Sequence, residues 1–361
     1  MEWENLSGGP IDRRKFIAGA AGVSMAVVAA ALSSCSPADS DASGSERGAE
    51  DEAASRSSDS AAPSADAGAS EASGEAPAVY FTRDISPAGL QRAFDALGMA
   101  PQGNVAVKLS TGEPGGHNFL SPELIAGLVQ GLGGTIVECN TAYGGARSTT
   151  ESHLQAAADH GFTAIADVDI MDADGSASLP VEGGSHLSED LVGAHFQNYD
   201  WVLSLAHFKG HAMGGFGGAI KNCSIGIASR EGKMLIHSAG ASTTSWGSPA
   251  QDDFLESMAE AAKAVADHMD GRICYVNVMN NLSVDCDCDS HPADPEMANI
   301  GILSSADPVA LDRACVDLVY AASDGAALVE RIESRNGAHT LEHAEAIGLG
   351  SQSYELVDMD A

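Results

Sequence analysis

The chain has 361 residues, with 18 lysines and arginines against 51 aspartates and glutamates, and its formal net charge is −33 at pH 7. This acidic excess argues against nucleic acid as a partner, because binding to a phosphate backbone requires a basic surface. Hydrophobic residues make up 44% of the chain, which is enough for one large domain or two small ones.

Residues 1–35 have the features of an export signal. Arg13 and Arg14 precede an apolar run from Ala18 to Leu32, which is typical of a twin-arginine signal. The residues that end in Cys35 resemble a bacterial lipoprotein box, in which the cysteine is lipidated and becomes the new N-terminus. We therefore expect the twin-arginine export machinery as a partner and a lipid anchor at Cys35. The protein would lie in the cell envelope, on the outer face of the cytoplasmic membrane.

Two further regions follow this signal. Residues 36–77 consist mainly of Ser, Ala, Gly, Asp and Glu, so they cannot bury enough apolar surface to fold and should form a disordered, acidic linker. Residues 78–361 show no internal repeat and no second linker, and we expect a single α/β domain there.

Apolar runs and helical patterns alternate along this domain. The predicted strands are Asn104–Ser110, Thr135–Cys139, Trp201–Leu205, Arg272–Val278 and Asn299–Leu303. The predicted helices are Pro87–Leu97, Pro122–Leu132, Glu151–His160, Asp252–Met269 and one that begins with Asp307 as N-cap and Pro308 as its first residue. This order predicts an α/β fold with a mostly parallel sheet and helices on both faces.

A histidine- and glycine-rich segment directly follows the strand at Trp201–Leu205. His207, Lys209 and His211 come first, and Gly217 and Gly218 precede Lys221 and Asn222. Two lysines beside glycines, in a chain with few cations, indicate a small anion as ligand, because glycine backbone N–H groups can line an anion-binding concavity. The alternative is that these polar residues only hold a long connection in place by hydrogen bonds.

Polar or glycine-rich segments also follow the other early strands. Lys108 ends the first strand, and His117 lies in the loop after it. Since the carboxyl ends of parallel strands share one edge of a sheet, we expect these loops to form one site, with Lys108 and His117 as further anion ligands.

Cys286 and Cys288 are the most specific chemical signal in the chain. In an extended segment, residues two apart point to the same side, so both sulfurs could bind one metal ion, with His291 close behind. The flanking aspartates disfavour two thiolates unless a cation is bound. A disulfide is one alternative, because the protein is expected to be exported. A third hypothesis is that both cysteines are unreactive thiols.

Two kinds of metal centre fit these residues. Zinc would be held by Cys286 and Cys288 with His207, His211 or His291, whereas an iron–sulfur cluster would also use Cys223 and Cys139. Cys223 and Cys139 could equally be buried core thiols, and Cys274 and Cys315 are expected in the core.

Several of these segments resemble the family known as domain of unknown function 362. The segments that carry the resemblance are Val105–Ser110, Val137–Thr141, His207–His211 with Gly217–Asn222, Gly301–Leu303 and Asp307–Asp312. The resemblance implies an α/β core and a metal or redox role, because many members carry an inserted ferredoxin-like segment with iron–sulfur motifs. This chain lacks cysteine motifs at the corresponding place, Gly232–Ser248.

Three hypotheses follow from the sequence. The first is an exported metal-binding protein with a redox role on a small anionic substrate, that is, a metal-dependent oxidoreductase. The second is a lipid-anchored protein that binds a small anion through Lys209 and Lys221 without catalysis. The third is an interaction module held by disulfides. Hydrolase and kinase motifs are absent from the sequence.

Overall fold

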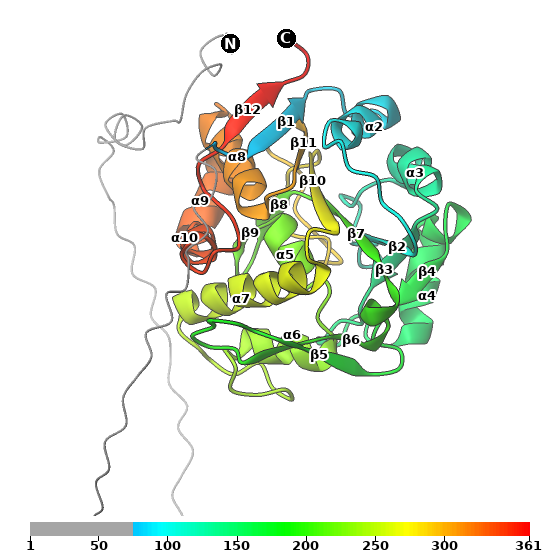
Figure 1. Ribbon diagram of the computed structural model, residues 1–361, viewed down its shortest axis with the longest axis vertical. Coiled ribbons are helices and arrows are strands. Elements are labelled where there is room, and N and C mark those ends of the chain that lie inside the picture. The colour runs from blue at the N-terminus through cyan, green and yellow to red at the C-terminus, as the bar shows by residue number, and fades with distance from the viewer. Residues whose placement is uncertain (1–74) are drawn as a thin grey trace, which may run out of the picture. The chain divides into compact units, whose positions relative to one another are not determined.

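The computed structural model describes residues 75–361 and is built around an eight-stranded sheet (Figure 1). In chain order, the strands of this sheet are β1 (Ala78–Thr82), β2 (Val105–Lys108), β3 (Thr135–Glu138), β4 (Val168–Ile170), β7 (Trp201–His207), β10 (Ile273–Met279), β11 (Gly301–Ser305) and β12 (Glu355–Asp358). Their spatial order is β12-β1-β11-β10-β7-β2-β3-β4. Two small hairpins accompany the sheet, namely β5 (Ser176–Pro180) with β6 (Glu189–Gly193), and β8 (Lys209–His211) with β9 (Gly215–Gly217).

Nine α-helices lie in the described residues. They are α2 (Pro87–Asp95), α3 (Pro122–Gly131), α4 (Thr150–Asp159), α5 (Ala219–Cys223), α6 (Arg230–His237), α7 (Gln251–Met269), α8 (Pro308–Ala321), α9 (Ala326–Ser334) and α10 (His339–Ala346). None of the helices in residues 75–361 has the length and apolar character needed to cross a bilayer. The predicted export signal, and all of the predicted linker before Glu75, lie outside the described residues.

The sheet is mostly parallel, which confirms the predicted fold class. β4, β3, β2, β7 and β10 pair in parallel, and only β11 runs antiparallel to its neighbours β10 and β1. All five predicted strands and all five predicted helices are present, with ends that differ by a few residues. The strands β1, β4 and β12 of this sheet were not predicted; β4 and β12 lie at its two edges, where few apolar residues are needed.

Helices cover both faces of the sheet, as predicted. Along β7, Val202 packs into one core while Leu203 and Leu205 pack into the other, because successive side chains of a strand point to opposite faces. The first core includes residues of α5, α7 and α8, and the second includes residues of α2, α3 and α4. Figure 1 shows these two groups of helices on opposite sides of the strands.

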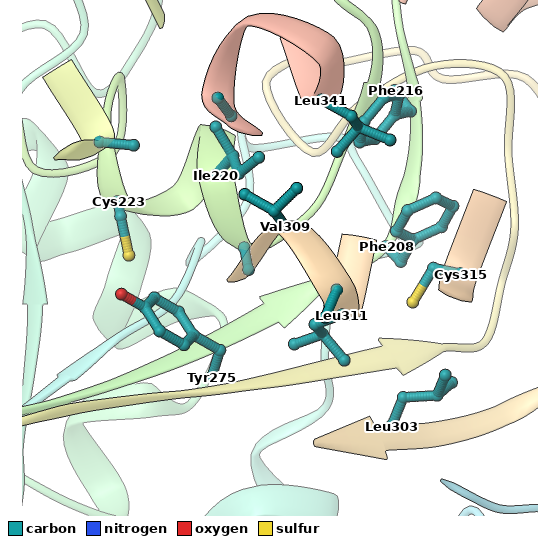
Figure 2. Packing of buried hydrophobic residues seen from close by; sticks show 14 of the residues in the cluster. Phe208, Phe216, Ile220, Cys223, Tyr275, Leu303, Val309, Leu311, Cys315 and Leu341 are labelled. Atoms are coloured by element: carbon teal, nitrogen blue, oxygen red, sulfur yellow. The ribbon is translucent and has the colours of Figure 1, made fainter. Parts of the chain in front are cut away.

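The core on the α8 side contains Cys315, as expected from the sequence. Cys315 is fully buried there, and Figure 2 shows its sulfur among Leu311, Leu303 and Phe208. Cys274 is fully buried in the opposite core, as its strand position predicts. The N-cap of α8 is also confirmed, since the Asp307 carboxylate accepts hydrogen bonds from the backbone N–H groups of Val309 and Ala310.

The histidine- and glycine-rich segment differs from the loop that the sequence suggests. β7 continues to His207, and Lys209–His211 then forms the first strand of a short hairpin. Gly215 has a φ of 80° and lies against the backbone of Gly337, so the position requires glycine. Some of the glycines therefore serve this tight hairpin and its packing.

Candidate functional site

The segments that follow four neighbouring strands meet at one edge of the sheet. β3, β2, β7 and β10 are adjacent and parallel, so their carboxyl ends lie side by side. Side chains from the segments after these strands line a pocket of about 250 Å³. Its charged lining consists of the cations Lys108, Arg147, Lys209, Lys221 and Lys233 and the acids Glu138 and Asp287. In an acidic protein, this edge of the sheet is therefore locally basic.

A buried ion-pair network forms one wall of the pocket. Lys108 Nζ lies 3.2 Å from Glu138 Oε2, and Arg147 Nη1 lies 3.1 Å from Glu138 Oε1. The Thr111 backbone N–H also donates to this carboxylate, at 2.7 Å. Burial alone would raise the pKa of Glu138, but Lys108, His153 and Arg147 together lower it well below its ordinary value. The charge of Lys108 is thus already balanced within the protein.

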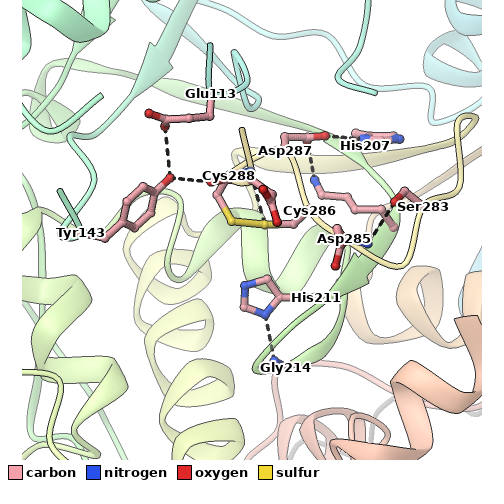
Figure 3. Close-up of a disulfide and its surroundings, with 12 residues drawn as sticks. Glu113, Tyr143, His207, His211, Gly214, Ser283, Asp285, Cys286, Asp287 and Cys288 are labelled. Atoms are coloured by element: carbon pink, nitrogen blue, oxygen red, sulfur yellow. Dashed lines mark hydrogen bonds and ion pairs between the residues drawn. A yellow bond between two sulfur atoms is a disulfide. The ribbon is translucent and has the colours of Figure 1, made fainter. Parts of the chain in front are cut away.

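Asp287, between the two cysteines, forms a second charged cluster (Figure 3). Its carboxylate accepts hydrogen bonds from His207 Nδ1 and from Lys209 Nζ, each at 2.8 Å. The other nitrogen of His207, Nε2, lies 2.7 Å from the Asn280 carbonyl oxygen. Both ring nitrogens therefore lie at hydrogen-bonding distance from oxygen atoms of the protein. Engaged in this way, His207 offers no lone pair to a metal.

Cys286 and Cys288 form a disulfide, which is one of the alternatives that the sequence leaves open. Cys286 is buried and Cys288 is partly exposed. The two cysteines line the pocket and also a neighbouring hollow of about 480 Å³. One ligand atom each of His211, Cys286 and Cys288 lie within 4.8 Å of one another. A metal ion at this place would need both sulfurs as thiolates, so the disulfide would first have to be reduced.

The imidazole of His211 lies beside the disulfide, as Figure 3 shows. Its Nδ1 accepts a hydrogen bond of 2.8 Å from the backbone N–H of Gly214. A nitrogen that accepts carries no hydrogen, so this contact assigns the hydrogen of the neutral ring to Nε2. Burial, and then the charge of Lys221, lower the pKa of His211 well below 6.5, which keeps the ring neutral at pH 7. Before it could bind a metal, Nε2 would have to lose this hydrogen.

The cysteines that an iron–sulfur cluster needs are not brought together. Cys139 and Cys223 are buried, and burial raises the pKa of each thiol to about 12. Cys139 Sγ instead donates a hydrogen bond of 3.2 Å to the carbonyl oxygen of Ile227. Within residues 75–361, the one group of three or more potential metal ligands is His211 with Cys286 and Cys288. The described residues therefore do not fit an iron–sulfur cluster, which requires four ligands.

The ammonium group of Lys221 differs from those of the other lysines around it. Within residues 75–361, no hydrogen bond or ion pair holds it. A Cβ at Gly217 would lie 3.2 Å from Lys221 Cδ and 3.7 Å from Lys209 Cε, so the two lysine side chains approach each other over this glycine. Burial, and then the Lys209 ammonium, lower the pKa of Lys221 to about 7. An anion bound between the two lysines would relieve their repulsion.

The backbone after Gly218 is already occupied by a protein carboxylate. The N–H groups of Ala219 and Ile220 donate to the buried Asp312 side chain at 2.8 and 3.0 Å. A Cβ at Gly218 would lie 2.2 Å from Asp312 Oδ1, which explains the glycine. Asn222 has a structural contact too, because its Nδ2 donates to the Lys108 carbonyl oxygen at 2.9 Å. Gly217, Gly218 and Asn222 line the pocket. The N–H groups of Ala219 and Ile220, which follow the glycines, are not free for an anion.

Two of the candidate residues lie away from the pocket. His117 is exposed, with Nε2 at 3.2 Å from Asp294 Oδ1. His291 is also exposed, with Nδ1 at 2.9 Å from Ser290 Oγ. Neither histidine belongs to the pocket lining.

Arg147, Lys233 and His237 belong to the pocket lining but were not singled out in the sequence. Lys233 and His237 lie on α6, which begins where the Ser229 hydroxyl accepts from the backbone N–H of Gly232. That capping serine, ahead of the apolar pair at residues 235–236, is a signal that could have predicted the helix. Arg147 has no comparable signal, because it lies in an irregular segment.

Fold and pocket together define an α/β protein with a basic site at the carboxyl edge of a mostly parallel sheet. The family described as domain of unknown function (DUF362) matches residues 105–317. The chain therefore belongs to this family, which confirms that part of the resemblance seen in its sequence. The match includes all of the strands whose carboxyl ends form the pocket. A search of curated proteins found no match.

Two solved structures are similar to part of the chain. The lactate racemase apoprotein from Thermoanaerobacterium thermosaccharolyticum is 14% identical with a TM-score of 0.42, over 67% of this chain and 57% of that one. A protein from Thermotoga maritima is 14% identical with a TM-score of 0.39, over 64% of this chain and 57% of that one. This chain thus spans little more than half the length of either protein.

Proposed function

We propose that this protein binds a small anion in the pocket between Lys209 and Lys221. The observation that carries this proposal is the Lys221 ammonium group, which lines the pocket without a protein partner in residues 75–361. Five lysines and arginines face two carboxylates in the pocket, although the net charge of the chain is −33. A basic concavity in an acidic protein concentrates anions at one place.

The contacts of the other cations narrow the place where an anion would bind. Lys108 already pairs with Glu138, and one donor of Lys209 is used by Asp287. An ammonium group has three donors, so Lys209 can still contribute to an anion that Lys221 holds. The pocket volume of about 250 Å³ is below the range of about 300 to 1,000 Å³ that is usual for drug-sized ligands. A small carboxylate or phosphate is therefore the expected class.

Calorimetric titration with inorganic phosphate and with succinate, at constant ionic strength, tests this proposal. Replacing Lys221 by Met removes a charge-assisted hydrogen bond worth about 1.5 to 3 kcal/mol, so the affinity should fall roughly 10- to 100-fold. The matched control is Lys263→Met, because Lys263 on α7 pairs with Asp267 and does not line the pocket. If neither anion binds, or if Lys221→Met binds as tightly as the control, the proposal is wrong.

A redox role for Cys286 and Cys288 is the second proposed function. Their disulfide has a sequence separation of 2, so it closes too short a loop to restrain the unfolded chain strongly. A dithiol substrate would attack one sulfur, release the other as a thiolate and then complete its own disulfide, leaving two protein thiols. Titration against dithiothreitol, followed by intact mass, should reveal a gain of two hydrogens in the wild type but not in Cys288→Ser. Resistance of the bond to excess dithiol would contradict this role.

The reduced pair could also bind zinc, with His211 as the third ligand. The mutual distances within 4.8 Å support this form of the metal hypothesis. Three protein ligands with an open fourth position are the pattern of reactive zinc sites. The reduced protein should bind one zinc ion per chain, and the oxidised protein or the Cys286→Ser variant should bind none. Equal zinc binding by the oxidised and reduced forms would rule out this site.

Export through the twin-arginine route and lipid attachment at Cys35 are proposed from the sequence alone. Arg13, Arg14 and Cys35 carry this proposal. In a bacterial host, replacing both arginines by lysine should leave the protein in the cytoplasm, and Cys35→Ala should release it from the membrane fraction. Unchanged fractionation of both variants would contradict envelope localisation.

A further inference from the structure

Anion binding alone does not account for three nitrogen groups in the pocket. Lys221, His211 and His237 all line it. Within residues 75–361, the Lys221 ammonium and the Nε2 atoms of both histidines have no hydrogen-bond partner in the protein. The charge of Lys221 also lowers the pKa of both imidazoles.

The two imidazoles present opposite hydrogen-bonding functions to the pocket. His237 Nδ1 lies 2.6 Å from the Lys233 carbonyl oxygen, which can only accept, so the hydrogen of the neutral ring is on Nδ1. Nε2 of His237 is then an acceptor with a free lone pair, whereas Nε2 of His211 carries a hydrogen and donates. Burial lowers the pKa of His237 to about 4, so this ring too is neutral at pH 7. The rings of Trp246 and Phe254 hold it, with centroids at 4.3 and 4.9 Å.

Lys221 lines the same pocket as these rings, and its amine is the candidate nucleophile there. Its side chain is only partly exposed and meets Lys209 across Gly217. Burial and the Lys209 charge lower the pKa of Lys221 to about 7, so a substantial fraction of the amine is free of its proton at neutral pH. A desolvated lysine beside another cation is a known way to activate an amine for attack on a carbonyl group.

We infer that the pocket forms a covalent iminium between Lys221 and a small anionic carbonyl compound of the 2-oxo acid class. The inference rests on the proposed anion binding, because Lys209 would hold the carboxylate of the substrate. Lys221 Nζ attacks the carbonyl carbon, and a C–N bond forms as the electron pair of the C=O bond moves to oxygen. The His211 Nε2–H donates a hydrogen bond to that oxygen as its negative charge develops.

The proton balance of this step closes within the pocket. Of the three ammonium hydrogens, one stays on nitrogen in the iminium, and two leave with the carbonyl oxygen as water. The lone pair on His237 Nε2 can carry these hydrogens from nitrogen to oxygen, one at a time. The C–O bond breaks as the nitrogen lone pair forms the C=N bond, and no oxidant or reductant is consumed.

Reductive trapping of the full-length protein tests this inference. Incubation with pyruvate and sodium cyanoborohydride, which spares disulfides, converts an iminium to a stable adduct that peptide mass mapping locates. Modification of Lys221 should be at least about tenfold faster than that of Lys263, and Lys221→Arg should lose the adduct at this position while still binding phosphate. His237→Phe, which keeps the stacking on Phe254, should slow trapping by roughly 100-fold.

The results distinguish iminium formation at Lys221 from the proposed binding of a small anion. Binding of phosphate and succinate without a preferred adduct at Lys221 would overturn the iminium and leave the anion pocket intact. Equal labelling of all lysines would overturn it as well. If neither anion binds and no adduct forms, both ideas fail together.

Discussion

The buried carboxylate of Asp287 provides a sharp test of how the site is held together. It is only 4% exposed and accepts hydrogen bonds of 2.8 Å from both His207 and Lys209. In Asp287→Asn, the amide can accept through one oxygen only, and its NH₂ group faces a donor. Breaking a buried charge cluster by neutralising one partner costs about 3 kcal/mol, at the lower end of the usual 3 to 5 kcal/mol. With an unfolding entropy of about 2.1 cal/mol/K per residue, Tm should fall by roughly 5 °C.

The same substitution should change the pH dependence of stability. Burial opposes ionisation, but Lys209 and His207 lower the pKa of Asp287 below its ordinary value of 3.8. A carboxyl whose folded pKa is lowered stabilises the protein above the unfolded pKa, and this stabilisation is lost as the pH falls through and below that value. The difference in unfolding free energy between wild type and Asp287→Asn should therefore be full at pH 7 and shrink below about pH 4.

Urea unfolding at a series of pH values measures both effects. The control variant is Asp289→Asn, because Asp289 lies in the same loop but is exposed. Its unfolding free energy should stay within about 0.5 kcal/mol of wild type at pH 7. If Asp287→Asn costs less than about 1 kcal/mol, or if its cost does not vary with pH, the contacts of Asp287 with His207 and Lys209 do not stabilise the fold.

Two further predictions concern the glycine and cysteine positions around the pocket. Gly218→Ala would place a Cβ 2.2 Å from Asp312 Oδ1 and should destabilise the protein by about 2 kcal/mol or more in urea unfolding, whereas Gly127→Ala, with open space around it, should be neutral or stabilising. After reduction of the native protein, iodoacetamide should modify the disulfide cysteines but not Cys139 or Cys223, whose thiol pKa values of about 12 leave little thiolate. Mass mapping of the peptides measures this, and modification of Cys139 or Cys223 instead of the disulfide cysteines would contradict the prediction.

Five strands of the sheet and its mostly parallel character could be predicted from local patterns. The apolar run that begins at Trp201 is fully buried along β7, and the Asp307-Pro308 pair begins α8 as expected. Because β2, β3, β7 and β10 are parallel neighbours, the polar segments that follow them meet at one edge of the sheet. The predicted succession of parallel strands led to the same expectation. These features depend on residues that are close in sequence, and local periodicity reports on them directly.

The contacts within the site could not be predicted in the same way. Asp287 pairs with His207 and Lys209 from about 80 positions away, and no sequence pattern chooses this pairing over a metal. The N–H groups after Gly218 are satisfied by Asp312, although a glycine-rich segment alone suggests that they are free. Partner choice of this kind is decided by tertiary packing, which periodicity does not contain.

The most direct measurement of anion binding is the position of bromide in a crystal of this protein. Anomalous scattering from bromide-soaked crystals should show a peak within hydrogen-bonding reach of Lys221 Nζ and on the side of Lys209. In crystals of Lys221→Met, that peak should disappear while peaks elsewhere persist. Bromide absent from the pocket, or a Lys221 ammonium group paired with a protein carboxylate, would contradict the proposed anion site.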